Sequence, residues 1–145
     1  VDEEPDDVLG HINHFKFISP QQIIVGRPDK AGTKVYHYLE KISKLFEKSG
    51  YEVIRVPGPE GFDHRLPGGD NTHTPLDANR LMMDKRSLLA TFDQEGLEKY
   101  NQEALAVYQQ ALPDYEVIPI EATIQTNAGG AINCSSKEIP DVNRY

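Results

Sequence analysis

The stretch Tyr51-Glu52-Val53-Ile54 recurs 64 residues later as Tyr115-Glu116-Val117-Ile118, and this repeat decides the predicted fold. At the same offset, Ile24-Val25-Gly26 corresponds to Leu88-Leu89-Ala90. Short apolar runs that are rich in branched residues and bounded by glycine or proline are typical of buried strands. Each half of the chain therefore contributes at least two strands of the same kind.

A helix is predicted between the two strands of each half. From Lys34 to Ser49 the apolar residues recur at intervals of three and four, and Gly50 follows as a natural helix end. The second stripe, from Leu97 to Ala111, matches the first at an offset of 62. A helix-length amphipathic segment between two strands is typical of a strand-helix-strand unit.

An additional strand is predicted before each of these units. Asn13-x-Phe15-x-Phe17 corresponds to Asn79-x-Leu81-x-Met83 at an offset of 66, and Asp84-Lys85 provides a turn after the second copy. Each half then reads strand, strand, helix, strand, which is a ββαβ module. A module of this size cannot bury its sheet and helix faces alone, so we expect the two modules to pack together.

The sequence predicts an α/β fold in which residues 1–145 form a single partial domain. The first ββαβ module is expected at 8–60, a long loop rich in proline and glycine at 61–78, and the second module at 79–122. Residues 123–145 would begin a third module and contain the only cysteine.

Composition excludes several classes of protein. The chain has 145 residues and a formal net charge of −8, with Lys and Arg scattered along it, so we expect no nucleic-acid partner. No apolar run approaches the ~18 residues of a membrane helix, so we expect no membrane span. The chain begins with Val1 rather than Met, so we expect a processed product or fragment. Localisation stays open, with the cytoplasm favoured.

Three segments carry residues that could do chemistry. They are Gly10-His11-Ile12-Asn13, Asn79, and Gly129-Gly130-Ala131-Ile132-Asn133-Cys134. A cysteine nucleophile needs a nearby base and donors for developing charge, and a glycine pair lets the backbone approach a ligand closely. Taken alone, a lone cysteine is more often inert and a lone histidine more often structural. The residues by themselves leave the question open.

Together these segments resemble a known family. Gly10-His11-Ile12-Asn13-His14-Phe15-Lys16-Phe17 is similar to the G-H-[VI]-D-x-[FWY]-x-[KR]-F segment of the agmatine deiminase and peptidylarginine deiminase family. Gly129-Gly130-Ala131-Ile132-Asn133-Cys134 resembles its G-G-x-x-x-C nucleophile segment, and Asn79-Arg80-Leu81 its N-S-L strand. The resemblance covers the C-terminal portion of that family. It implies the pentein fold, a propeller of five ββαβ modules around a central site.

The resemblance implies hydrolytic deimination of a guanidino group. Cys134 would attack the guanidinium carbon to form a covalent thiouronium, and His11 would protonate the departing nitrogen and then activate water. The substrate contacts that it implies are Asn13, Asn79, Gly129 and Gly130. We expect a guanidino small molecule or an arginine-containing peptide as partner, and no metal or cofactor.

Two departures from the family pattern keep alternatives open. Asn13 stands where the family has Asp, which could cost about tenfold in binding or rate. The family's other guanidinium carboxylate and the acidic partner of its histidine precede this segment, so we expect little deiminase activity from this chain alone. A homo-oligomer or a second chain could complete the propeller. The alternatives are an amidinotransferase of the same fold and a non-catalytic binding or assembly module.

The long loop holds a weaker candidate for a metal site. Its acidic and histidine residues lack any recognised ligand spacing, and a solvated loop is the favoured interpretation. These residues are Asp63, His64, Asp70, His73 and Asp77.

Overall fold

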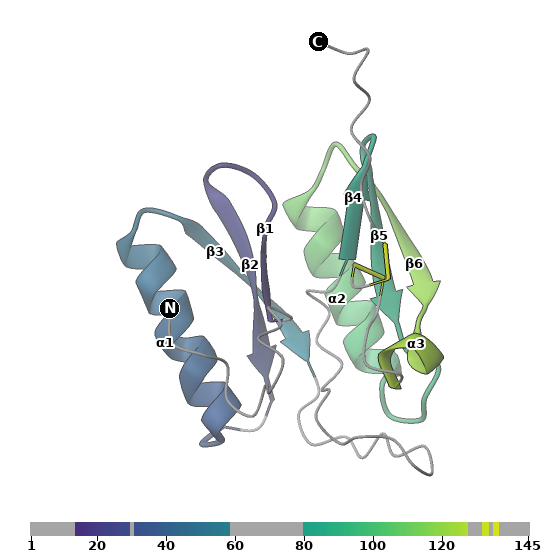
Figure 1. Cartoon of the computed structure of the whole chain (residues 1–145), viewed down its shortest axis with the longest axis horizontal. Coiled ribbons are helices and arrows are strands. Elements are labelled where there is room, and N and C mark those ends of the chain that lie inside the picture. The colour runs from purple at the N-terminus through teal and green to yellow at the C-terminus, as the bar shows by residue number, and fades with distance from the viewer. Residues whose placement is uncertain (1–13, 30, 59–79, 128–131, 134, 137–145) are drawn as a thin grey trace.

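A computed structural model describes residues 14–29, 31–58, 80–127, 132–133 and 135–136 of the chain. It contains two groups of elements, the first drawn in purple to blue and the second in teal to yellow in Figure 1. The first group comprises β1 (Phe15–Phe17), β2 (Gln22–Pro28), α1 (Lys34–Lys48) and β3 (Glu52–Gly58). The second comprises β4 (Arg80–Met83), β5 (Arg86–Thr91), α2 (Glu98–Ala111), β6 (Glu116–Glu121) and the short α3 (Thr123–Asn127).

Each group forms a three-stranded sheet with the same topology. The orders are β1-β2-β3 and β4-β5-β6, with the first pair antiparallel and the second pair parallel. The helix in each group makes the crossover between the two parallel strands, as parallel pairing requires. The expected α/β class, the two helices and the strands within the described residues are therefore confirmed. The boundaries 8–60, 61–78, 79–122 and 123–145 remain predictions, and α3 was not predicted.

Local sequence explains where α1 begins and ends. The Thr33 hydroxyl accepts a hydrogen bond from the Tyr36 amide at 3.2 Å, which caps the first turn. Gly50, just after the helix, has φ +89°, a left-handed conformation that ends helices and that glycine adopts without a steric penalty. Leu39 and Ile42 are buried against the first sheet. The predicted apolar stripe is thus the face that packs.

A tight hairpin joins β4 to β5. Asp84 and Lys85 have φ values of 43° and 62°, the left-handed pair found in two-residue turns whose twist matches that of the strands. The predicted turn at these two residues is confirmed. Neither residue is glycine, so the antiparallel pairing that flanks the turn holds both in a conformation that L-residues adopt uncommonly.

Helix α2 packs between the two sheets (Figure 1). One apolar cluster spans both groups of elements and includes residues of each sheet and of the helix. Its buried members are Ile24, Val56, Leu89, Ala104, Tyr108 and Leu112. Leu89 lies on the second sheet, whereas Ile24 and Val56 lie on the first, so burial of α2 joins the two groups into one core.

Two polar contacts cross the same boundary. The Tyr100 hydroxyl donates a hydrogen bond to the Asp29 carboxylate, and Arg27 pairs with Glu103 at 2.9 Å. The Arg27 and Glu103 side chains are both 52% exposed, so this ion pair contributes at most about 1 kcal/mol. Tyr100 is only 8% exposed, and its bond to a carboxylate contributes about 1.5–3 kcal/mol. The tyrosine contact is the stronger polar link.

The second sheet keeps one apolar face that no described helix covers. Leu81, Leu88 and Ile118 are cross-strand partners, and they alternate along their strands with residues such as Leu89 that face α2. Ile120, further along the same face, is 38% exposed. In the first sheet the corresponding face, which carries Ile24, is the one buried by α2.

His14 lies directly before β1 and is buried, with 9% of its surface exposed. Its backbone carbonyl accepts a hydrogen bond from the Gly26 amide at 2.7 Å, which fixes the chain entering β1 to β2. Desolvation by burial lowers the pKa of the His14 imidazole from 6.5 to about 4. The native state therefore holds this ring in its neutral form.

The burial of His14 predicts that the free energy of unfolding falls as the pH is lowered from 6.5 to about 4. Because the folded pKa lies below the unfolded one, the unfolded chain takes up the proton first in this window, and stability rises with pH. The loss through the window is about 3 kcal/mol.

Urea unfolding over this pH range checks the expectation. The His14→Gln variant should lose the corresponding part of the pH slope, whereas His37→Gln, at an exposed histidine, should keep it. An unchanged slope in His14→Gln would contradict the assignment.

Candidate functional site

The side chain of Lys16, in the middle of β1, connects three parts of the chain. Its Nζ donates a hydrogen bond to the backbone carbonyl of Arg80 at 2.8 Å and a second one to Oδ1 of Asn133. Arg80 begins β4, and Asn133 lies in the segment after α3. One ammonium group thus holds two strands, one from each sheet, together with the C-terminal segment.

These three residues adjoin the three segments singled out in the sequence. Lys16 follows Asn13 by three residues, Arg80 directly follows Asn79, and Asn133 directly precedes Cys134. The predicted site residues themselves lie outside the described residues: His11, Asn13, Asn79, Gly129, Gly130 and Cys134. Their roles stay predictions, but described residues next to each segment meet at Lys16.

Arg80 anchors the carbonyl that Lys16 reaches. Its guanidinium is fully buried, donates from Nη1 to the Ser87 hydroxyl at 3.0 Å, and lies 5.0 Å from the centre of the Tyr108 ring. Nε and Nη2 have no hydrogen-bond partner among the residues that the structure describes. Burial lowers the pKa of this guanidinium, and Tyr108 and Tyr115 partly offset the effect. A buried cation above an aromatic ring holds the start of β4 rigidly.

Sequence patterns assign Arg80 no role beyond its place in the predicted strand. A charged residue in an apolar strand is normally read as facing solvent. In the structure Arg80 pairs in register with Leu89, and so it lies on the face covered by α2. Only the tertiary packing of Tyr108 above this face reveals that its guanidinium is enclosed.

Ile132 attaches the C-terminal segment to the second sheet. It packs against a small apolar cluster at the end of that sheet, whose members are Ala90, Phe92, Leu97, Tyr100 and Ala122. The helix α3 begins directly after this cluster. Hydrogen bonds from the Thr123 side chain and from the Thr123 amide, the latter at 2.7 Å, lower the pKa of the Glu121 carboxyl group. Asn133 therefore bonds to Lys16 from a segment whose preceding residue, Ile132, packs against the second sheet.

In the described part of the chain, no three His, Cys, Asp or Glu side chains lie close enough together to hold a metal ion. The loop candidates Asp63, His64, Asp70, His73 and Asp77 lie outside the described residues. No helix within the described ranges is long and apolar enough to cross a membrane.

Known proteins resemble this chain in sequence and in fold. An agmatine deiminase of Medicago truncatula is 27% identical over 161 residues, covering 94% of this chain and 42% of its own. The structure of a C. jejuni agmatine deiminase variant with substrate bound superposes with a TM-score of 0.70 at 18% identity, over 92% of this chain and 38% of that one. A putative arginine deiminase of Porphyromonas gingivalis gives 0.70 at 25% identity, over 91% and 39%.

The solved structures establish the fold, and the sequence comparison establishes the family. The chain spans about two fifths of the length of the relatives that it matches. A family model described as Porphyromonas-type peptidyl-arginine deiminase matches residues 3–140, which is nearly the whole sequence. The resemblance expected from the motifs is thereby confirmed, and the chain belongs to the Porphyromonas-type peptidyl-arginine deiminase family.

Proposed function

We propose that this chain is the nucleophile-bearing part of an enzyme that hydrolyses the guanidino group of agmatine or of an arginine side chain. Family membership supports the reaction class. The observation that carries the proposal is the contact of Lys16 with Arg80 and Asn133, because it joins residues next to all three motif segments. This contact supports the proposal that the three motif segments, which are far apart in sequence, act at one site.

In the proposed reaction, the thiolate of Cys134 adds to the guanidinium carbon. The bond from this carbon to a terminal nitrogen then breaks, and His11 gives that nitrogen a proton so that it leaves as ammonia. A thiouronium remains on sulfur. His11, now neutral, takes a proton from water, whose oxygen attacks the same carbon and releases the ureido product and the thiolate.

We propose that the ammonium group of Lys16 favours formation of the Cys134 thiolate. A cation lowers the pKa of a neighbouring thiol and so raises its thiolate fraction. The ammonium of Lys16 bonds to Asn133, the residue directly before Cys134. The backbone amides at Gly129 and Gly130, together with Asn13 and Asn79, are the groups that we propose to contact the substrate.

We also propose that a further ββαβ module covers the bare face of the second sheet, as in a five-module propeller. The first sheet provides the internal precedent, since α2 buries Ile24 on its corresponding face. On the second sheet that face carries Leu88 and Ile118, and Ile120 is 38% exposed. Leu88 and Ile118 are only partly buried, and an apolar face that is incompletely covered in this way is typical of an interaction site. A second copy of this chain, or a different chain, could supply the module that covers this face.

Alkylation of Cys134 tests the proposed nucleophile. With iodoacetamide we expect labelling with a pH midpoint below the ~8.5 of a free thiol, and slower labelling in the His11→Ala variant. Agmatine should protect Cys134, whereas butylamine, which lacks the guanidinium, should not. Since Cys134 is the only cysteine, Cys134→Ala gives the background.

Labelling at the rate of a free thiol, unaffected by agmatine, would contradict the nucleophile role and favour a non-catalytic binding module. If an adduct forms, its discharge by water indicates a deiminase. Discharge only by an added amine indicates an amidinotransferase.

The native mass of the purified chain in solution tests whether a second copy covers this face of the second sheet. In a solution of the purified chain alone, a second copy is the only partner available, so we expect concentration-dependent association above 16.3 kDa. Ile118→Lys should abolish it by placing a charge on the face. Leu45→Lys, at an exposed leucine on α1, is the matched control. A monomeric mass for the unmodified chain at every concentration would contradict the proposal.

A further inference from the structure

A cleft opens between the first sheet and the end of α2, at the opposite end of the strands from Gly26, whose amide bonds to His14. Its volume is about 730 Å³, within the range of small-molecule sites. Gln22 and Glu52, which line it, begin β2 and β3. Gly26 lies four residues further along β2, about 13 Å away. The cleft therefore lies at the other end of β2 from His14, although Ile18, which also lines it, is only two residues from Lys16.

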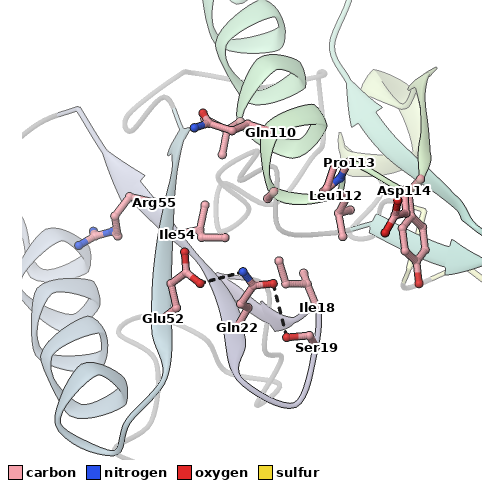
Figure 2. Close-up of a pocket in the computed structure, with 13 residues that line it drawn as sticks. Ile18, Ser19, Gln22, Glu52, Ile54, Arg55, Gln110, Leu112, Pro113 and Asp114 are labelled. Carbon is pink, nitrogen blue, oxygen red and sulfur yellow. Dashed lines mark hydrogen bonds between the residues drawn. The ribbon is translucent and has the colours of Figure 1, made fainter.

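One part of the lining of the cleft is apolar. It consists of Ile18 and Ile54 from the first group of elements, with Val107, Ala111 and Leu112 from the end of α2. Figure 2 labels Ile18, Ile54 and Leu112. Except for Leu112, which is buried, these side chains are only partly buried, and they continue the apolar cluster that joins the two sheets. An aliphatic chain placed there would bury surface that is now exposed to water.

The polar groups at the opening are acidic. Glu52 lies on one side and accepts a hydrogen bond from the Gln22 amide at 2.8 Å, and Asp114 lies on the other side. Figure 2 shows these two carboxylates on opposite sides of the cleft. The last turn of α2 also ends here and contains no basic residue. Helix C-termini carry a partial negative charge, which adds to that of the carboxylates.

The one cation among the lining residues is already paired elsewhere. Arg55 alternates with Ile54 along β3, so its side chain leaves on the other face of the sheet, as Figure 2 shows. There its guanidinium bonds to Glu40 at 2.7 Å and to the Gly26 carbonyl at 3.0 Å. The charge of Arg55 is neutralised away from the cleft, which leaves the opening with a net negative charge.

We propose that this cleft binds a linear alkylammonium ion, with its ammonium group at the opening, in the combined negative potential of Glu52 and Asp114, and its chain along Ile54 and Val107. A neutral chain of the same length lacks the charge, and an alkyl carboxylate has the wrong sign. For a ligand with seven non-hydrogen atoms, we expect a Kd of about 1 mM. This proposal does not depend on the catalytic role of Cys134.

Calorimetric titration of the purified chain with hexylammonium chloride tests the proposal. We expect one site, with hexanol and hexanoate binding at least about tenfold more weakly. Glu52→Gln and Asp114→Asn should each weaken hexylammonium binding about threefold to tenfold. Glu95→Gln removes the same charge from an exposed position outside the cleft and should leave binding unchanged.

Two further variants test whether hexylammonium binds in this cleft or at the predicted catalytic segments. Val107→Trp fills the cleft and should abolish binding, with the thermal unfolding of the variant showing that it is folded. Cys134→Ala should bind hexylammonium as the unmodified chain does. No binding of hexylammonium at about 10 mM, equal binding by the Glu52 and Asp114 variants, or loss of binding in Cys134→Ala would overturn the proposal.

Discussion

The rest of the structure depends on the burial of α2 between two sheets. Tyr108 and Ala104 pack on Leu89 of the second sheet and on Ile24 and Val56 of the first. This single apolar contact sets the relative position of β1 and β4. Only when these strands are so placed can the ammonium of Lys16 reach the Arg80 carbonyl at 2.8 Å.

The same packing creates features with different chemistry at the two ends of α2. Near its N-terminus, Tyr100 bonds to Asp29, and Ile132 packs beside Leu97 to support the segment that carries Asn133. At its C-terminus the helix diverges from the first sheet and leaves the acidic cleft between Glu52 and Asp114. An amphipathic helix that separates two sheets thus supports the proposed catalytic segments at one end and the proposed cation site at the other.

Much of the fold could be predicted because its signals are local. The apolar stripe with Leu39 and Ile42, the left-handed Gly50 and the repeat of Tyr51-Glu52-Val53-Ile54 each depend on near neighbours in sequence. The duplication then predicted the same succession of strand, strand, helix and strand in both halves. The helix α3 was missed because Thr123–Asn127 is too short to show an apolar period.

The functional features divide in the same way. The motif segments around His11 and Cys134 could be found because their residue types and order match a known family. Lys16 as a link, Arg80 as a buried cation and the cleft at Glu52 depend on contacts between residues 28 or more positions apart. No local sequence pattern predicts that a lysine in a three-residue strand will donate a hydrogen bond to a backbone carbonyl of another sheet.

Hydrogen exchange in the Lys16→Met variant tests most directly whether the Lys16 ammonium group holds β1, β4 and the segment with Asn133 together. Methionine keeps the length of the side chain and removes the donor. Losing a charge-assisted bond of about 1.4 kcal/mol or more should speed amide exchange about tenfold in the peptide that contains Ile132 and Asn133. Lys44→Met, at an exposed lysine on α1, should leave that exchange unchanged. If Lys16→Met also leaves it unchanged, the three segments do not depend on Lys16, and the account is wrong.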